Sequence, residues 1–440
     1  MSTLRGRASP DLILNAAVLG VGMHPGAWRL RREPPATAFT PAYFRRIGEL
    51  AEAACLHAVF LADTLSVDEE NYERPNLGAV DPLLALTLIA GATEHVGLVA
   101  TASTTFSEPF GLARRFASLD HLSGGRAAWN VVTTFVPAVA ANFGSAPLPA
   151  PADRYRRAEE FVDVVQALWR SWQADALIGD QESGHYAEAT RVKRLNHHGE
   201  FFDVAGPLTL PPSPQGEPVL FQAGSSEAGR GLAARTADAV FTAQNTLVAA
   251  QAFRRDMRSR VAAAGRDPDR FKVLPGLLAV LGGTEAEARA RKARLDELAG
   301  DAERRKLALR LGVPVELLQL DAPLPVDAVL ANPAFKGAEG FRQAALELGV
   351  REGLTVREIL YRNGGGHVQV VGTPEQVADH IAHWHREGAV DGFNLMIDVL
   401  PDGLEDLVEQ VVPLLQRRGL FRDEYAGRTL RANLGLHSQP

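Results

Sequence analysis

The sequence predicts an α/β fold, a (β/α)8 barrel, from three observations. Short apolar runs rich in Val, Ile, Leu and Phe alternate along the chain with longer segments of helical periodicity. The apolar runs are nearly continuous, as expected for the strands of a parallel sheet covered by helices. The alternation repeats eight times in 440 residues, the number that a (β/α)8 barrel requires. The alternative fold, an open doubly wound sheet, does not require eight repeats.

The predicted elements follow one another along the whole chain. We expect strands at 12–22, 58–63, 96–104, 127–133, 218–224, 239–244, 273–282 and 392–397. We expect helices at 41–54, 82–93, 109–119, 154–172, 227–236, 247–264, 284–300 and 404–418. Three of these helices have clear start signals, a capping side chain followed by Pro or Glu: Thr40–Pro41, Asp81–Pro82 and Thr284–Glu285.

Three stretches do not fit a minimal barrel. Residues 134–153 and 174–217 lie on either side of the helix that follows the fourth strand, and residues 301–370 lie between the seventh and eighth strands. The second stretch predicts a small hairpin in "HHGEFFDVAG", and the third contains the helical piece "GFRQAALEL" and the glycine run "NGGGH". Because loops this long are typical of lids or binding elements, we expect one barrel domain, residues 1–440, with 174–217 and 301–370 as lids.

Composition excludes several classes of protein. The net charge is −7 and no long basic block occurs, so we expect no nucleic-acid partner. The single cysteine, Cys55, lies in a helical pattern and allows no disulfide within one chain, which fits a reducing cytoplasm. The run "LILNAAVLGVGM" resembles part of a signal peptide, but Asn15 interrupts it and "HPGAW" is no cleavage site, so we interpret it as a buried strand. No apolar run is long enough to predict a membrane span.

The carboxyl ends of the predicted strands, where barrels of this kind carry their chemistry, are polar but little charged. Only Asp63 is clearly acidic there, whereas a hydrolase or lyase barrel usually shows several carboxylates, a Lys or a His cluster. Donors and acceptors of this kind suit a large neutral heterocycle with a phosphate tail, although each one alone also fits a cap or a turn. The set comprises His24, Asp63, Thr104, Thr105, Asn130, Thr133, Thr134, Ser225, Ser226 and Gln244.

The stretch "QAGSSEAGRGLAAR" (222–235) joins the fifth strand to a helix and has two interpretations. Ser226 is a typical helix cap and Gly224 eases the turn. The N–H groups of a helix N-terminus, with the hydroxyls of Ser225 and Ser226, also form a ready site for a phosphate. Their place at the end of a barrel strand favours the phosphate site.

Other chemistry-bearing residues are weaker candidates. His197 and His198 lie in the hairpin, and the three histidines of "DHIAHWH" do not share one helix face, so we expect no metal site. "DHLSGGR" (120–126) precedes a strand and therefore predicts a helix-ending turn at the opposite face, with Gly124 and Gly125 in the bend.

A family resemblance covers nearly the whole chain in order. The run "GLVATASTTFSEPFGLARRFASLDHLSGGRAAWNVVTTFVPAVAANFG" (97–144) resembles the nitrilotriacetate monooxygenase branch of the bacterial-luciferase-like flavin monooxygenases. So do "DRYRRAEEFVDVVQALW" (153–169), "SPQGEPVLFQAGSSEAGRGLAARTADAVFTAQ" (213–244) and "RRGLFRDEYAGRTLRANLGL" (417–436), whereas 301–366 matches loosely.

The resemblance implies an FMN site built from particular residues. It places Asp63 and Thr104 beside the isoalloxazine or the ribityl chain and Asn130 on the polar edge of the ring. It assigns the phosphate to Tyr155, Ser225 and Ser226. Members often carry a His four residues before that Tyr, where this chain has Pro151, so that contact is in doubt unless Arg154 replaces it. We name His24 as the candidate for proton handling, against the alternative of a solvated loop histidine.

The resemblance also implies the reaction and the partners. FMN is used as FMNH2 from a separate NAD(P)H:flavin reductase, and a C4a-hydroperoxyflavin transfers one atom of O2 to a small organic substrate. We also expect a homodimer or a homotetramer. The alternatives are an F420-dependent oxidoreductase, a non-catalytic flavin-binding protein and a metal-dependent hydrolase. The residues that choose the substrate lie in the least matched segments.

Overall fold

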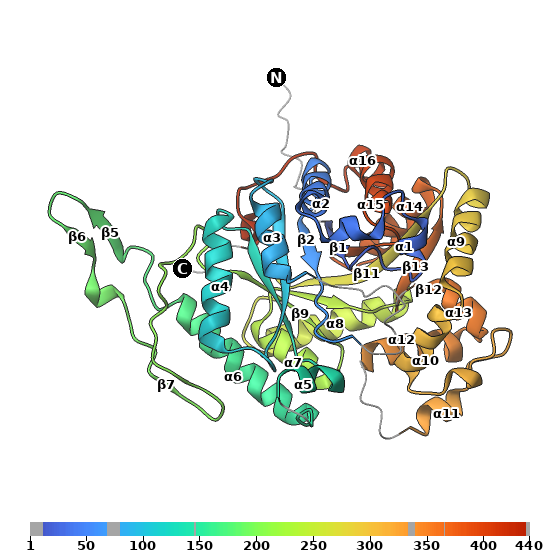
Figure 1. Cartoon of the computed structure of the whole chain (residues 1–440), viewed down its shortest axis with the longest axis horizontal. Helices are drawn as coiled ribbons and strands as arrows, with labels where there is room; N and C mark the ends of the chain where they lie inside the picture. The colour runs from blue at the N-terminus through green and yellow to red at the C-terminus, as the bar shows by residue number, and fades with distance from the viewer. Residues whose placement is uncertain (1–11, 68–79, 145–146, 333–338, 365, 437–440) are drawn as a thin grey trace.

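The computed structural model describes residues 12–67, 80–144, 147–332, 339–364 and 366–436. Eight parallel strands form the barrel, each hydrogen-bonded to the next, and the eighth pairs with the first through Ile13↔Gly392 to Ala17↔Met396. These eight predicted strands are confirmed (Figure 1). They are β1 (Ile13–Val18), β2 (Ala58–Leu61), β3 (Gly97–Ser103), β4 (Ala127–Val132), β9 (Val219–Ala223), β10 (Ala239–Thr242), β11 (Lys272–Leu281) and β14 (Gly392–Ile397).

A further parallel strand, β13 (His367–Gly372), was not predicted. It pairs with residues 277–281 of β11, beyond the segment 272–275 that pairs with β10. A two-residue strand, β12 (Asn363–Gly364), pairs with it in the antiparallel sense. The sequence "HVQVVG" follows directly on the glycine run, so its short apolar pattern was interpreted as the end of the 301–370 insertion.

The helices surround the barrel and begin at the predicted caps. Thr40, Asp81 and Thr284 each accept a hydrogen bond from the first turn of the helix that follows, and Thr284 forms a full capping box with Glu287. The outer helices are α2 (Pro41–Ala53), α3 (Pro82–Ala90), α4 (Pro109–Leu122), α6 (Pro151–Trp169), α7 (Glu227–Thr236), α8 (Leu247–Ala263), α9 (Glu285–Ala299) and α14 (Pro374–Arg386). Beyond β14 the chain forms α15 (Asp402–Asp406), a π-helical turn (Leu407–Val411) and α16 (Val412–Arg417).

One local prediction was wrong. Cys55 lies outside the helical pattern, because α2 ends at Ala53 and Cys55 has a left-handed backbone with φ 56°. The residue turns the chain from the helix into β2, and its thiol donates to the carbonyl of Asp423 at 3.3 Å.

The N-terminal end of the barrel is closed by the last described part of the chain. Leu430 of helix α17 (Leu430–Asn433) and Leu434, the residue just after it, are both buried in one cluster with Ile13, Ala58 and Val99 of three barrel strands. A Cβ at Gly97 would lie 2.5 Å from a methyl carbon of Leu430, so only glycine fits there. The floor is therefore a packed apolar plug, and the carboxyl ends of the strands are the end available to a ligand.

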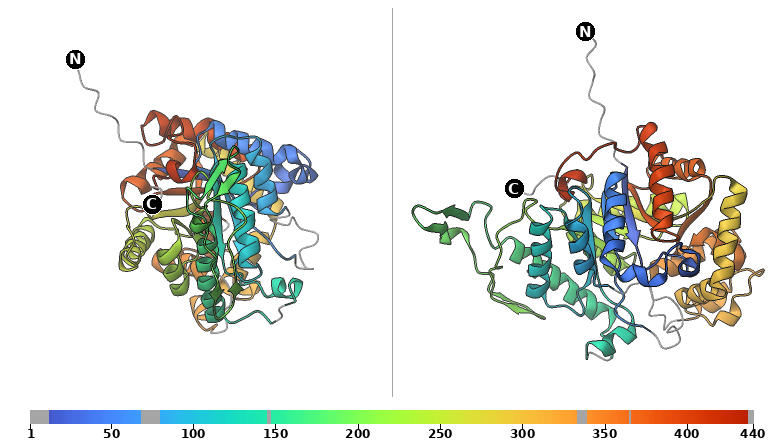
Figure 2. Two further views of the ribbon diagram at one scale, coloured as in Figure 1. Left: turned by 90° about the vertical axis from the view of Figure 1, so that its left-hand side faces the viewer. Right: turned by 45° about the horizontal axis from the view of Figure 1, so that its top comes forward.

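The two ends of the segment 174–217 lie at the N-terminal side of the barrel, whereas its hairpin at 197–204 packs along α6 as far as Arg156, one residue from Tyr155. The role of the segment as a lid stays a prediction. The segment follows α6, and its residues Ser213 and Gln215 donate to the carboxylate of Asp120 in the last turn of α4, just before β4. The predicted turn there is confirmed, with Gly124 and Gly125 at φ 69° and 90°. The predicted hairpin is β7 (His197–His198) with β8 (Asp203–Val204), and a second hairpin, β5 (Leu177–Asp180) with β6 (His185–Ala187), projects away from the barrel (Figures 1 and 2).

The stretch after β11 folds as a helical cluster with a core of its own. It contains α10 (Ala302–Leu311), α11 (Val326–Leu330), α12 (Glu339–Arg351) and α13 (Val356–Arg362). Leu307, Leu311, Leu348 and Ile359 are among its buried residues. The four helices gather at the lower right in Figure 1, and we call them the helical insertion.

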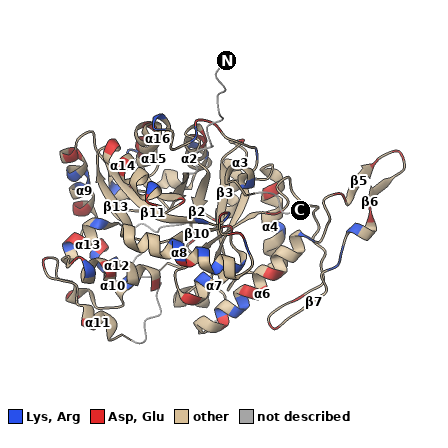
Figure 3. Cartoon of the chain, turned by 180° about the vertical axis from the view of Figure 1, so that it is seen from behind, with Lys and Arg blue, Asp and Glu red and all other residues tan. Residues whose placement is uncertain are grey.

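The outer surface carries charges of both signs. Figure 3 shows basic and acidic residues interspersed along α6, α7, α9 and the helical insertion. Within the described part of the chain, none of the helices has the length and apolarity that a membrane crossing requires.

Candidate active site

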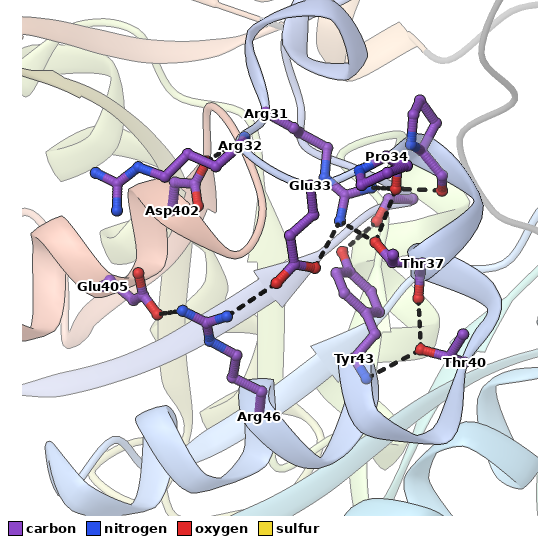
Figure 4. Close-up of polar contacts among 12 residues, drawn as sticks. Arg31, Arg32, Glu33, Pro34, Thr37, Thr40, Tyr43, Arg46, Asp402 and Glu405 are labelled. Atoms are coloured by element: carbon purple, nitrogen blue, oxygen red, sulfur yellow. Dashed lines mark hydrogen bonds and ion pairs between the residues drawn. The ribbon is translucent and has the colours of Figure 1, made fainter.

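The loop that follows β1 is fixed to the segment that follows β14. Arg46 contacts the carboxylates of both Glu33 and Glu405, and the backbone N–H of Arg32 donates to Asp402 Oδ2 at 3.1 Å (Figure 4). The loop after the first barrel strand and the segment after the last one are therefore held together by these contacts beside the mouth of the barrel.

His24 lies in this loop, and both of its ring nitrogens are engaged. Nδ1 accepts a hydrogen bond from the N–H of Gly26 at 3.1 Å, and Nε2 lies 3.0 Å from Asp296 Oδ1 on α9. Because Nδ1 is an acceptor, the ring proton lies on Nε2 and is donated to Asp296. Burial opposes ionisation of Asp296, but the hydrogen bond from His24 and the charge of Lys292 lower its pKa. This geometry weighs against the proton-handling role predicted for His24 and favours a role in holding the loop on α9.

Tyr155 and Ser226 meet at the N-terminus of α7, although 71 residues separate them. The Tyr155 hydroxyl lies 3.1 Å from Ser226 Oγ, which accepts the N–H of Gly229 at 3.1 Å. The capping interpretation of Ser226 is therefore confirmed. A Cβ on Gly229 would lie 3.1 Å from both hydroxyl oxygens, so the absence of a side chain there leaves room for them. Two hydroxyls and the first N–H groups of a helix converge on one small region.

Ser225 lies beside this region and faces the helical insertion. Its Oγ is 3.1 Å from Thr242 Oγ1 at the end of β10, and Gln244 Nε2 donates to the same Thr242 oxygen at 3.0 Å. A Cβ on Gly340 at the start of α12 would lie 2.7 Å from Ser225 Oγ. Ser225, Ser226, Gln244 and Gly340 line one cavity of about 850 Å³ between α7, α8 and the insertion.

Asn130 and Thr104 lie on adjacent strand ends in the barrel. Asn130 is buried in β4 and its amide donates to Thr101 Oγ1 at 2.9 Å, while its Oδ1 has no hydrogen-bond partner among the described residues. Thr104 is fully buried just past β3 and its hydroxyl donates to the carbonyl of Val132 at 3.2 Å. The hydroxyl of the next residue, Thr105, is buried and has no partner within the described segments. This edge of the mouth thus has spare acceptor and donor capacity.

Asp63 lies two residues beyond β2 and is half-buried. Burial, assisted by the nearby charge of Asp81, raises the pKa of its carboxyl to about 6. Asp63 therefore changes charge near neutral pH. A raised pKa of this kind is more typical of a carboxyl in a ligand site than of a solvated carboxyl.

Pro151 occupies the first position of α6, and Arg154 lies one turn further on. Arg154 is buried, its Nη1 donates to the carbonyl of Pro149 at 2.6 Å, and its Nε has no partner in the described part of the chain. Arg154 therefore has a donor to spare beside Tyr155 in the sequence, and its replacement of the missing His stays a prediction.

The predicted non-site histidines have structural contacts. His197 is 2.9 Å from Glu160 Oε1 and His198 is 2.7 Å from Asp203 Oδ1. His380 packs on Trp384 and burial lowers its pKa to about 4. Among the residues that the structure describes, no three His, Cys, Asp or Glu side chains form a group that could hold a metal ion.

Sequence reasoning missed His367 at the start of β13. Its ring is 2% exposed and occupies the space above Gly276, where a Cβ would lie 2.4 Å from Nδ1. It stacks on Phe241 of β10 with the ring centroids 5.1 Å apart. The signal that could have found it is the short apolar run after "NGGGH", which makes His367 the first residue of a strand.

An eight-stranded barrel with polar strand ends and hydroxyls at a helix N-terminus beside a cavity fits the class of barrel enzymes that hold a phosphate-bearing ligand at the carboxyl ends of their strands. The family model described as luciferase-like monooxygenase matches residues 23–391. The chain belongs to this family, and it is a flavin-dependent monooxygenase, as the resemblance implied.

Particular relatives resemble it over almost their whole length. The chain is 42% identical to the N-acetyl-S-(2-succino)cysteine monooxygenase of Bacillus subtilis (strain 168), over 96% of each chain. It is 43% identical to nitrilotriacetate monooxygenase component A of Aminobacter aminovorans, over 94% of each. Among solved structures, it matches the EDTA monooxygenase of Chelativorans sp. BNC1 with a TM-score of 0.81 at 34% identity, over 97% of this chain and 99% of that one. It matches DmoA of Hyphomicrobium sulfonivorans with a TM-score of 0.85 at 32% identity, over 97% and 92%.

Proposed function

We propose that this chain is the oxygenase component of a two-component system that binds FMN as FMNH2 and inserts one atom of O2 into a small organic substrate. The reduced flavin comes from a separate NAD(P)H:flavin reductase. The observation that carries the proposal is the junction of Tyr155, Ser226 and Gly229 at the N-terminus of α7, beside a cavity of about 850 Å³.

The residues fit the phosphate end of FMN. One hydroxyl of the Tyr155–Ser226 pair donates to the other, and the one that accepts keeps its own proton for a phosphate oxygen. The N–H groups in the first turn of α7 also favour an anion. Ser225 adds a third hydroxyl, and the free Nε of Arg154 supplies a nearby positive charge. These groups would hold the phosphate without any metal ion.

The strand ends fit the ring and the ribityl chain. The unpartnered Oδ1 of Asn130 would accept a ring N–H, and Thr104 and Asp63 would lie along the ribityl chain or the ring edge. With its pKa raised to about 6, Asp63 donates a hydrogen bond when neutral and accepts one when charged. His24 keeps the adjoining loop in place through Asp296.

Bound FMNH2 supplies the chemistry, because it reacts with O2 and delivers one oxygen atom to the substrate. The protein binds the flavin, orients the substrate against it and excludes water. The helical insertion excludes water from the site, since Gly340 of α12 already lies against Ser225. We regard residues 1–440 as one barrel domain in which this insertion is the lid.

We also propose that the protein is a homodimer or a homotetramer. The β5–β6 hairpin projects from the barrel with Leu177, Ile178 and Tyr186 exposed by 44%, 47% and 68%. An arm without a core of its own gains stability when a second copy covers these side chains.

Two measurements test the function. The purified protein is mixed anaerobically with FMNH2, and then O2 is admitted. We expect tight FMNH2 binding and flavin-dependent O2 consumption, but no oxidation of NADH by the protein alone, because the chain has no dinucleotide fingerprint. Lack of FMNH2 binding, or rapid NADH oxidation by the isolated protein, would contradict the proposal.

A substitution tests the phosphate site. Tyr155→Phe removes one charge-assisted hydrogen bond, so FMNH2 affinity should fall by about ten- to a hundred-fold. Tyr425→Phe is the matched control, because that tyrosine is also half-buried and its hydroxyl donates to the carbonyl of Leu56 at 2.8 Å, far from α7. Equal affinities of the two variants would show that Tyr155 only packs.

A further inference from the structure

The cavity of about 850 Å³ lies beside the proposed phosphate site and outside the mouth of the barrel. Its walls are the outer helices α7 and α8 together with α11 and α12 of the helical insertion. Ser225 and Ser226 line it, whereas the residues assigned to the flavin ring and the ribityl chain, Asp63, Thr104 and Asn130, do not. The cavity therefore begins where the phosphate of a bound flavin would end, on the side away from the ring.

Apolar side chains of three helices gather in this cavity. Val248 of α8, Leu330 of α11 and Val350 of α12 are exposed by 60%, 63% and 59%, and all three line it. Exposed apolar side chains that meet at one place are typical of a binding surface. The volume also lies within the range of small-molecule sites, about 300–1,000 Å³. The cavity thus has the size and the walls of a ligand site.

Arg230 lies at the junction between the cavity and the phosphate site. Its backbone N–H donates to the carbonyl of Ser226 at 2.8 Å within the first turn of α7, and its side chain lines the cavity. Nη1 donates to Asp256 at 2.9 Å and Nη2 to Glu227 at 3.4 Å, but the buried Nε has no hydrogen-bond partner among the described residues. An arginine with a donor to spare suits a second phosphate group next to the first.

The charges of the cavity do not repel a phosphate. Each of the four carboxylates that line it has its own arginine partner within 4.0 Å. The pairs are Glu227–Arg260, Asp256–Arg230, Glu347–Arg351 and Glu339–Arg342. The walls are therefore close to neutral.

We propose that this cavity holds the adenylate half of FAD, so that the flavin site of this enzyme accepts FAD as well as FMN. FAD is FMN with an adenylate on its phosphate, so a phosphate held at Ser225 and Ser226 directs the adenylate into the cavity. The planar adenine lies between the apolar side chains of α8 and those of α11 and α12, within reach of the Gln343 amide. Arg230 binds the second phosphate.

This inference rests on the proposed function, from which it takes the position of the phosphate. FMN requires the cluster at Tyr155, Ser225 and Ser226, whereas FAD requires the cavity as well. The ratio of the FAD affinity to the FMN affinity therefore reports on the cavity.

The test measures the binding of FMN, FAD and ADP to the purified protein by titration calorimetry. ADP is used because it is FAD without the riboflavin. Ala252→Trp fills the cavity from an exposed position of α8, and its matched control is Ala262→Trp, on the same helix and exposed but outside the cavity. Val248→Glu adds a carboxylate to the cavity, and its control is Leu309→Glu, at a residue of the insertion that is 79% exposed and does not line it. Thermal unfolding without flavin shows that each variant is folded.

We expect the parent to bind FAD with an affinity within about tenfold of its FMN affinity. Ala252→Trp and Val248→Glu should each lower the ratio of the FAD affinity to the FMN affinity by at least about tenfold, because the first excludes the adenine and the second repels the diphosphate. The two controls should keep the ratio of the parent within about twofold.

The inference is overturned if the parent binds FAD more than about a hundred-fold more weakly than FMN. It is also overturned if Ala252→Trp and Val248→Glu keep the ratio of the parent. If neither flavin binds the parent, the proposed function fails. ADP binding that is lost in Ala252→Trp and kept in Ala262→Trp would in that case still support the cavity as the adenosine site, and absence of ADP binding would overturn both.

Discussion

Two glycines of α7, Gly229 and Gly231, allow a test of the phosphate site in which one is the control for the other. A Cβ on Gly229 would lie 3.1 Å from the oxygens of Tyr155 and Ser226, closer than ordinary contact, so these hydroxyls must move by a few tenths of an ångström. A Cβ on Gly231 would meet no atom within 4 Å. Alanine favours a helix over glycine by about 0.5–1 kcal/mol at either position.

The two alanine variants should therefore separate stability from affinity. Gly231→Ala should raise the free energy of unfolding by about 0.5–1 kcal/mol and leave FMN affinity unchanged. Gly229→Ala should lose much of that gain, because the Tyr155–Ser226 bond contributes about 0.5–1.5 kcal/mol. Displacement of the two hydroxyls should also weaken FMN binding by roughly tenfold, or about 1.4 kcal/mol.

The assay is a fluorescence titration of FMN, repeated anaerobically with FMNH2, beside urea unfolding of the flavin-free proteins. Equal FMN affinities for the two alanine variants would refute the assignment of the phosphate to Tyr155 and Ser226. A loss of affinity in both would show that the helix itself, and not the hydroxyl pair, decides binding.

Three further outcomes are expected. Asp63 has a pKa of about 6 in the folded protein against an ordinary 3.8, so its neutral form is favoured and the stability it contributes is lost as pH rises through about 6. Between pH 4 and pH 7, the free energy of unfolding in urea should fall by about 1 kcal/mol more for the parent than for Asp63→Asn, after allowance for solvent screening. Parallel pH profiles of the two proteins would contradict this. Leu430→Ala, at the floor of the barrel, should cost about 2–5 kcal/mol in urea unfolding with FMN affinity unchanged, and a cost below 1 kcal/mol would show that the floor is loosely packed. Serine at Leu177, Ile178 and Tyr186 should lower the mass of the assembly in light scattering, whereas an unchanged mass would exclude the hairpin as the contact between copies.

Local sequence patterns predicted the barrel because its determinants are local. Apolar strands, capping residues such as Thr284 and the glycines of the turn at 124–125 act within a few residues of themselves. β13 was missed because a short apolar run after glycines does not distinguish a strand from a loop. The lid prediction for 174–217 is not decided by loop length, because length alone does not say at which end of the barrel each part of a loop lies.

The site was less predictable because its contacts join distant parts of the chain. Nothing near His24 in the sequence indicates that Asp296, 272 residues away, takes its ring proton. The contacts of His367 likewise come from three separate elements, β10, β11 and α12, so the run after the glycines predicted at most its strand and not its neighbours. Ser226 is the exception, since its position at a strand–helix junction predicted a cap and the structure contains that cap.

The plug formed by Leu430 and Leu434 affects the order in which the protein folds during synthesis. Ile13 and Ala58 belong to the first two strands of the barrel, whereas the side chains that cover them are synthesised only after all eight strands. Until then the growing chain has eight strands with an open apolar floor, which is a surface that chaperones bind and that promotes aggregation. A chain that stops shortly before Leu430 therefore has all eight strands but leaves the apolar floor of its barrel uncovered.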